Sequence, residues 1–150
     1  MWDAKTRRAF ERMSDIGHRV TNDAVRDYRL LYELKDELTK PGNRHAVGRE
    51  NANLGLMYLL LFHPSPLIRH EAAFMFGEYG KPCSFLRSVA FLDEDATVRH
   101  EAALAMSTKS QRAYVDRNKW VLEHIARNDK SKMVRDTAMV SLNTIEGYVR

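Results

Sequence analysis

PLIRHEAAFMF, residues 66–76, returns as ATVRHEAALAM at residues 96–106, and a weaker third copy, KMVRDTAMV, occupies residues 132–140. The second copy begins 30 residues after the first, and the third begins 36 residues after the second. Such a period is long enough for two short helices and two turns. Because a pair of helices cannot bury its apolar face alone, neighbouring pairs must stack to form a core. The repeat therefore predicts an all-α stack of helix pairs.

The apolar residues along the rest of the chain follow the spacing of helices that are separated by short breaks. The clearest break is Lys40-Pro41-Gly42-Asn43. No stretch alternates polar and apolar residues for long enough to indicate a strand. We expect one domain over residues 1–150, with an N-terminal helical extension or cap at 1–40 and the repeats at 43–147. Helices are predicted at about residues 3–16, 23–39, 48–62, 66–79, 83–92, 96–107, 112–127 and 131–147.

Each copy of the repeat has a candidate helix cap in front of it, namely Ser65, Asp95, and either Asp129 or Ser131. A stripe along each repeated helix is predicted to face the core. It consists of Ile68, Ala72, Met75 and Tyr79 in the first copy and of Val98, Ala102 and Met106 in the second. A second face lines either a neighbouring helix or a groove, and it carries His70, Ala73, Phe74 and Gly77, and equally His100, Ala103, Leu104 and Ser107.

The composition argues against several classes of protein. The chain has 24 basic and 20 acidic residues, and its net charge of +4 is scattered, whereas nucleic-acid binding usually shows as a clustered basic stripe. The longest apolar run, Leu54–Phe62, has nine residues and is too short to cross a bilayer. The single cysteine, Cys83, excludes an internal disulfide and fits a reducing cytosol. We therefore expect a cytoplasmic protein with neither a membrane nor a nucleic-acid partner.

Two His-Glu pairs, His70-Glu71 and His100-Glu101, are the residues with metal-ligand character, because imidazole and carboxylate suit iron, zinc and manganese. Adjacent residues on a helix point about 100° apart, so one ion cannot easily take both members of a pair. Two histidines in the same register on neighbouring helices can instead converge on one ion. Two ligands make an incomplete site, which a second copy of the chain, related by a two-fold axis, would complete.

The succession Leu-Ile-Arg-His-Glu-Ala-Ala and Val-Arg-His-Glu-Ala-Ala resembles the paired His-Glu motifs of deoxyhypusine hydroxylase, a di-iron enzyme built of HEAT repeats. The resemblance covers about residues 43–147, one half of that family's chain. It implies a HEAT-like helical solenoid in which His70 and His100 bind one iron. One of Glu71 and Glu101, with Glu71 preferred, would bind the iron of the opposite half, and the other would support it.

The same resemblance implies an activity. Glu71 and Glu101 are the candidate catalytic residues of a non-haem di-iron monooxygenase, which uses O2 to hydroxylate a C–H group. A homodimer would hold two iron ions, and a protein or peptide would be the substrate. The third copy, Val134-Arg135-Asp136-Thr137-Ala138, lies where that family continues with a repeat that lacks the motif.

An alternative needs no metal. Val-Arg-x-Glu-Ala-Ala also resembles the general consensus of bilin-lyase-type HEAT repeats, in which the arginine and alanines are packing residues. The chain would then be a HEAT-repeat scaffold whose surface binds a protein partner. A helical nucleic-acid binder is a third hypothesis. In each case Arg69, Arg99 and Arg135 are predicted to form a structural ladder that caps turn carboxylates between repeats.

The remaining reactive residues are predicted to have structural roles. His63 stands at a helix end, where a cation would favour the helix dipole. His124 is expected to be packed or on the surface, and His18 and His45 to lie in loops. Cys83 is expected to be a small packing residue. Asp136, which replaces the third histidine, is expected to be a surface carboxylate.

Overall fold

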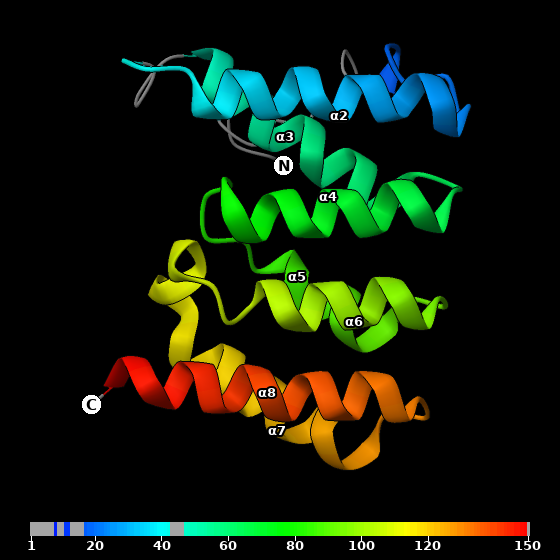
Figure 1. The fold of residues 1–150 in the computed structure, drawn as a ribbon. Helices are drawn as coiled ribbons and strands as arrows, with labels where there is room; N and C mark the ends of the chain where they lie inside the picture. The colour runs from blue at the N-terminus through cyan, green and yellow to red at the C-terminus, as the bar shows by residue number, and fades with distance from the viewer. Residues whose placement is uncertain (1–7, 9–10, 13–16, 43–46, 150) are drawn as a thin grey trace. The chain divides into compact units, whose positions relative to one another are not determined.

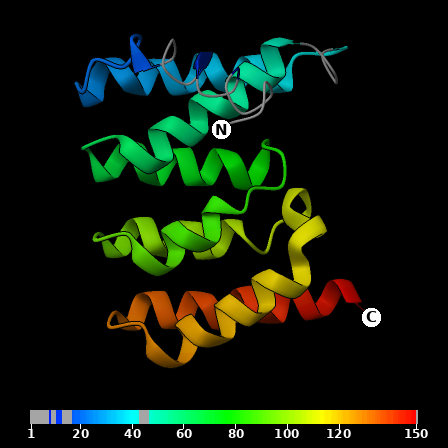
Figure 2. The ribbon, with the colours of Figure 1, turned by 180° about the vertical axis from the view of Figure 1, so that it is seen from behind.

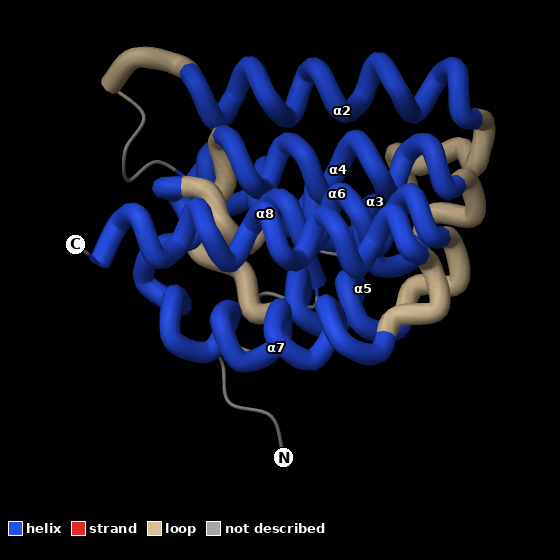
Figure 3. Tube along the Cα trace, turned by 60° about the horizontal axis from the view of Figure 1, so that its bottom comes forward, coloured by secondary structure: helices blue, strands red, loops and turns tan. Residues whose placement is uncertain are grey.

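A computed structural model describes residues 8, 11–12, 17–42 and 47–149, and these residues form helices and loops but no strand (Figures 1 and 3). The all-α prediction is therefore confirmed for the described residues. The helix expected over residues 3–16 lies mostly outside them, as does His45. The helices are α2 (Ala24–Thr39), α3 (Val47–Phe62), α4 (Pro66–Glu78), α5 (Phe85–Leu92), α6 (Ala96–Ala105), the 3-10 helix η1 (Lys109–Tyr114), α7 (Val115–Asn128) and α8 (Lys132–Val149).

The helix bounds agree with the sequence prediction to within a few residues, except ahead of α7. There a 3-10 helix precedes α7, because the side chain of Gln111 ties this segment to main-chain groups of other turns. Its amide nitrogen donates to the carbonyls of Phe76 (3.0 Å) and Lys81 (3.2 Å), and its oxygen accepts from the N–H of Cys83 at 2.7 Å. No described helix combines the length and the apolar character that crossing a bilayer requires.

The chain divides into two compact units, residues 1–72 and 73–150, and the boundary falls inside α4. In the first unit α2 packs against α3. Leucines dominate this contact, because both helices present them at helical spacing, and the buried ones are Leu30, Leu31, Leu34, Leu38, Leu56, Leu59 and Leu60.

The second unit has two layers of helices (Figures 1 and 2). α5 packs against α6, α7 packs against α8, and α6 lies beside α8. The predicted core stripe is confirmed except at Tyr79, which is only half-buried. Its buried members are Ile68 and Ala72 in the first unit and Met75, Val98, Ala102 and Met106 in the second. The interior of the second unit also contains Leu86, Leu122, Ile125, Val134, Ala138 and Ile145.

The turn in front of each repeated helix uses one hydrogen-bond pattern. Asp95 caps α6, and its Oδ1 accepts from the N–H groups of Thr97 (2.8 Å) and Val98 (3.3 Å). Two residues before each cap position, a side chain accepts the N–H of the cap residue at 2.8–3.0 Å; these pairs are His63 with Ser65, Asp93 with Asp95, and Asp129 with Ser131. Of the two cap candidates for the third copy, Ser131 therefore takes the cap position.

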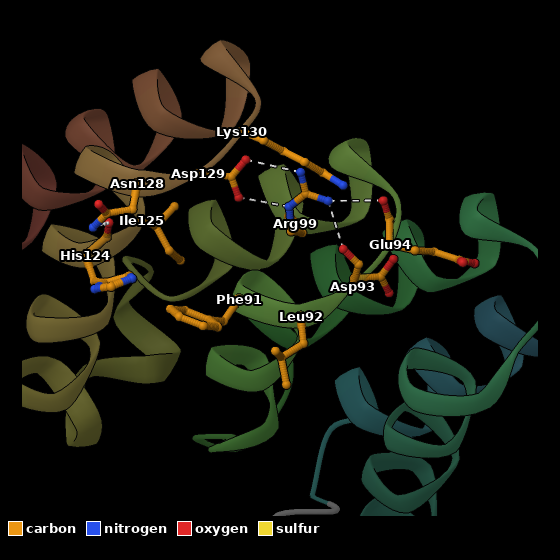
Figure 4. A pocket seen from close by; sticks show the side chains of 10 residues that line it. All are labelled: Phe91, Leu92, Asp93, Glu94, Arg99, His124, Ile125, Asn128, Asp129 and Lys130. Atoms are coloured by element: carbon orange, nitrogen blue, oxygen red, sulfur yellow. Dashed lines mark hydrogen bonds and ion pairs between the residues drawn. The ribbon is translucent and has the colours of Figure 1, made fainter.

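The three repeat arginines bind the same turns. Each donates from Nη1 to main-chain oxygens in front of its own helix at 2.6–3.1 Å, from Arg69 to His63 and Pro64, from Arg99 to Asp93 and Glu94, and from Arg135 to Asp129. Arg99 also forms a bidentate pair with the Asp129 carboxylate, through Nε (2.9 Å) and Nη2 (3.1 Å) (Figure 4). The predicted ladder is thereby confirmed at Arg99, which joins the second copy to the turn of the third.

Gly77 marks a close approach of two helices within the second unit. A Cβ added there would lie 3.0 Å from the Cα of Ala105, which is backbone and cannot move aside. The carbonyl of Gly77 also accepts from the hydroxyl of Thr108 at 2.6 Å. Glycine is therefore required at this position for lack of space rather than for its backbone angles.

Gly77→Ala tests this packing. We expect it to lower the free energy of unfolding by about 1–3 kcal/mol relative to Gly147→Ala, because overpacking forces the helices apart. Gly147 is the matched control, since it also lies in a helix but has nothing within 4 Å of the added Cβ. Urea unfolding followed by circular dichroism measures both. Equal stability of the two variants would show that the contact is not tight.

Candidate metal centre

The first His-Glu pair lies in the first two turns of α4. His70 Nδ1 stands 3.4 Å from Glu71 Oε1, and both side chains are partly exposed, at 29% and 21%. The hydrogen bond to Tyr32 and the negative charge of Glu71 raise the pKa of Tyr28 to about 12. The Glu71 carboxylate therefore interacts electrostatically with Tyr28 on α2 as well as with the adjacent His70.

The second pair lies on α6, next to α8. His100 is half-buried, and its Nδ1 lies 2.6 Å from Oγ1 of Thr137 on α8. Thr137 Oγ1 in turn donates to the carbonyl of Met133 at 2.9 Å. Glu101 is buried, with only 7% of its surface exposed. The imidazole of His100 therefore lies partly exposed where α6 meets α8, whereas the carboxylate of Glu101 is buried.

A groove of about 590 Å³ lies over this edge, and His100 is part of its lining. The other lining residues are Leu104, Lys132, Met133, Asp136, Thr137 and Val140. Lys132 and Asp136 pair across one turn of α8, and both are exposed, which confirms Asp136 as a surface carboxylate. Of the two alternatives predicted for the second face, a neighbouring helix or a groove, both apply at His100, which contacts Thr137 of α8 and lines the groove.

The two pairs belong to different compact units, since Glu71 lies in residues 1–72 and His100 in residues 73–150. Within residues 8, 11–12, 17–42 and 47–149, no three side chains of His, Cys, Asp or Glu gather closely enough to hold an ion. The convergence of His70 and His100 on one iron, and the roles of Glu71 and Glu101, stay predictions.

His63 follows the last residue of α3, at a helix end as predicted, but its side chain is buried and bonded to groups outside that helix. Its Nε2 lies 2.9 Å from Asp27 Oδ2, and its Nδ1 accepts the N–H of Ser65 at 3.0 Å. The two side chains are 0% and 1% exposed. One ring nitrogen of His63 accepts a hydrogen bond from the turn after α3, and the other faces the Asp27 carboxylate on α2. The buried His63 side chain therefore links α2 to that turn. The partners are 36 residues apart, and local sequence carries no signal for such a pair.

The other reactive residues have structural environments. His124 is exposed and its ring lies 5.0 Å from that of Phe91, in a pocket separate from the groove (Figure 4). His18 lies in a turn, as expected. Cys83 is buried, as expected of a packing residue, and burial raises the pKa of its thiol.

The family model for HEAT repeats matches residues 54–143. Similar proteins include the deoxyhypusine hydroxylase of Neurospora crassa, which is 34% identical over 122 residues, covering 79% of this chain and 35% of the relative. The deoxyhypusine hydroxylase of Gibberella zeae is 30% identical over 142 residues, covering 89% of this chain and 39% of the relative. The chain thus spans little more than a third of these relatives. No solved structure matches it.

Proposed function

Since this chain belongs to the HEAT-repeat family and is related to deoxyhypusine hydroxylase, we propose that it is an iron-dependent, hydroxylase-like protein whose ligands are its two His-Glu pairs. One observation carries the proposal: the structural repeat places the pairs in the same register of α4 and α6. The turn contact and the arginine contacts recur in front of both helices, so the register is a property of the folded chain.

The donor set fits iron. Imidazole nitrogens and carboxylate oxygens are the ligands of non-haem iron sites that leave positions open for a substrate. His70 and His100 would bind the metal through ring nitrogens, Glu71 would supply a carboxylate to the iron of the opposite copy, and the buried Glu101 would support the site. Iron held in this way supplies, when bound, the activation of O2 for hydroxylation of a C–H bond. The half-buried position of His100 beside the groove leaves room for a ligand there.

A second copy of the chain would complete the site. Two histidines and two glutamates are too few for two irons, and a two-fold dimer would double them. The groove beside His100 supports this arrangement, because the exposed apolar side chains of Leu104, Met133 and Val140 surround the imidazole. A partner that covers them would remove apolar surface from water and shield the iron. The resulting homodimer would hold two irons and act on a protein or peptide.

Iron content tests the proposal. We expect protein purified from iron-replete cells to carry about one iron per chain, and His70→Ala or His100→Ala to lose most of it, because removing one of few ligands weakens a metal site strongly. His124→Ala is the matched control, since His124 is an exposed histidine of another pocket, and it should keep its iron. Wild-type protein that stays metal-free after anaerobic addition of Fe²⁺ would overturn the proposal.

A metal-free scaffold that binds a protein partner is the second candidate. The observation that favours it is the exposed apolar surface of α8, where Met139 and Val140 are more than half exposed. On this alternative the histidine substitutions would change neither the stability nor partner binding, and Val140→Asp would abolish partner binding.

A further inference from the structure

We infer that Thr137 is a positioning residue that holds His100 with its proton on Nδ1, so that Nε2 carries the lone pair that binds iron. The part of this inference that concerns iron rests on the proposed function. The part that concerns the tautomer of His100 rests on the geometry alone and is tested separately.

The Thr137 hydroxyl accepts a hydrogen bond from His100 because its own hydrogen is donated within α8. A hydroxyl has one hydrogen to donate and two lone pairs. Thr137 Oγ1 donates to the Met133 carbonyl at 2.9 Å, the back-bonding geometry of threonine within a helix. Its hydrogen is therefore used, and at 2.6 Å from His100 Nδ1 the oxygen accepts. The proton of a neutral imidazole then lies on Nδ1, and the lone pair lies on Nε2.

Thr137 stands at an equivalent position of the repeat to Glu71 and Glu101. Asp136-Thr137 occupies in the third copy the position that His-Glu occupies in the first two. The third copy thus lacks the metal-ligand pair but supplies a partner to the histidine of the copy before it. Histidines that bind metals commonly donate their other ring N–H to such a partner, which fixes the tautomer and the ring orientation. A hydroxyl does so without adding a charge.

The contact between Thr137 and His100 is held in place by the packing of α6 against α8. Thr137 is buried, and Val134 and Ala138 on either side of it are fully buried against the core. One turn further along α8, Ser141 donates from its hydroxyl to the carbonyl of Ala103 on α6 at 3.1 Å. This second bond fixes the register of α6 and α8 independently of His100. The oxygen of Thr137 is therefore presented to the imidazole by packed helices, as a positioned ligand requires.

Three substitutions separate positioning from packing. Thr137→Val removes the hydroxyl at nearly constant shape, and Thr137→Ser keeps it. Ser141→Ala is the matched control, because it removes the neighbouring α6–α8 hydrogen bond without touching His100. Long-range ¹H–¹⁵N spectra of the metal-free protein report which nitrogen of His100 carries the proton. We expect Nδ1–H in the wild type, Thr137→Ser and Ser141→Ala, and a shift toward Nε2–H in Thr137→Val.

Titration with Fe²⁺ alone, without oxygen, is the second readout. We expect Thr137→Val to bind Fe²⁺ about 10–100-fold more weakly than the wild type, the usual effect of losing such a partner. Thr137→Ser should restore most of the affinity, and Ser141→Ala should leave it unchanged. A wild-type His100 protonated on Nε2 would overturn the inference, even if iron binds. Equal losses in Thr137→Val and Ser141→Ala would also overturn it. Absence of Fe²⁺ binding together with an Nδ1–H His100 would instead refute the proposed function and leave the tautomer established.

Discussion

Asp129→Ala is expected to lower the free energy of unfolding by about 3–5 kcal/mol, the cost of leaving a buried charge without its partner. The guanidinium of Arg99 is 3% exposed and the carboxylate of Asp129 is 7% exposed. Without the carboxylate, the bonds that Arg99 keeps within the described part of the chain are those to two main-chain oxygens, which carry no net charge. The same substitution removes the acceptor for the N–H of Ser131 in front of α8.

The ionisation of Asp129 supports this magnitude. Burial alone would raise the pKa of its carboxyl group, but the hydrogen bonds from Arg99 and from the Ser131 N–H outweigh burial, and the pKa is lowered. The carboxylate is therefore charged at neutral pH, where it pairs with Arg99. Figure 4 shows this pair where the turn before α8 meets α6.

Urea unfolding at pH 7 measures the effect, with an exposed ion pair as the control. Arg19 and Glu33 pair at 2.9 Å, but their side chains are more than half exposed. We expect Glu33→Ala to change the free energy of unfolding by less than about 1 kcal/mol, as is usual for surface pairs. A loss in Asp129→Ala no larger than this would show that the ladder does not stabilise the stack.

Asp27→Asn is expected to lower the free energy of unfolding by about 2–3 kcal/mol at neutral pH, because hydrogen bonds to a buried charged group are strong. Asp27 accepts from the N–H (3.0 Å) and hydroxyl (2.9 Å) of Thr21 and lies against His63. Burial alone would raise the pKa of Asp27, but the bonds from Thr21 and His63 outweigh it, and the pKa is lowered.

The lowered pKa fixes the sign of the pH dependence. A carboxyl group whose pKa is lower in the folded state stabilises the fold above its unfolded pKa of about 3.9, and this stabilisation is lost as the pH falls through the folded pKa. The difference between wild type and Asp27→Asn should therefore hold above about pH 5 and shrink below about pH 4. Asp23→Asn is the control on the same helix, since asparagine caps as well as aspartate. A difference that grows on acidification would contradict this description of Asp27.

The local features of the fold follow from local sequence. Asp95 before an apolar spacing, and Pro66 after Ser65, specify where α6 and α4 begin, because capping involves residues only a few positions apart. The core stripes follow from the helical period. The recurrence of arginine at one position of three copies also predicts the main-chain contacts that all three arginines make and the carboxylate contact that Arg99 makes.

The contacts missed from the sequence join distant residues. Thr137 lies 37 residues after His100, and Asp27 lies 36 residues before His63. Both depend on how helices stack, which spacing within one helix does not specify. A signal existed nevertheless for Thr137, because it occupies the glutamate position of the third copy. The 3-10 helix ahead of α7 was missed because the side chain of Gln111, and not a proline or glycine, shapes that turn.

The most direct test of the proposed iron site is the mass of the intact assembly with its metal. Native mass spectrometry of anaerobically purified protein should show a dimer that carries two irons, and His100→Ala should give a species without iron while His124→Ala keeps both ions. A wild-type monomer without iron, obtained from iron-replete cells and unchanged by added Fe²⁺, would contradict the proposal that this chain is an iron-dependent, hydroxylase-like protein.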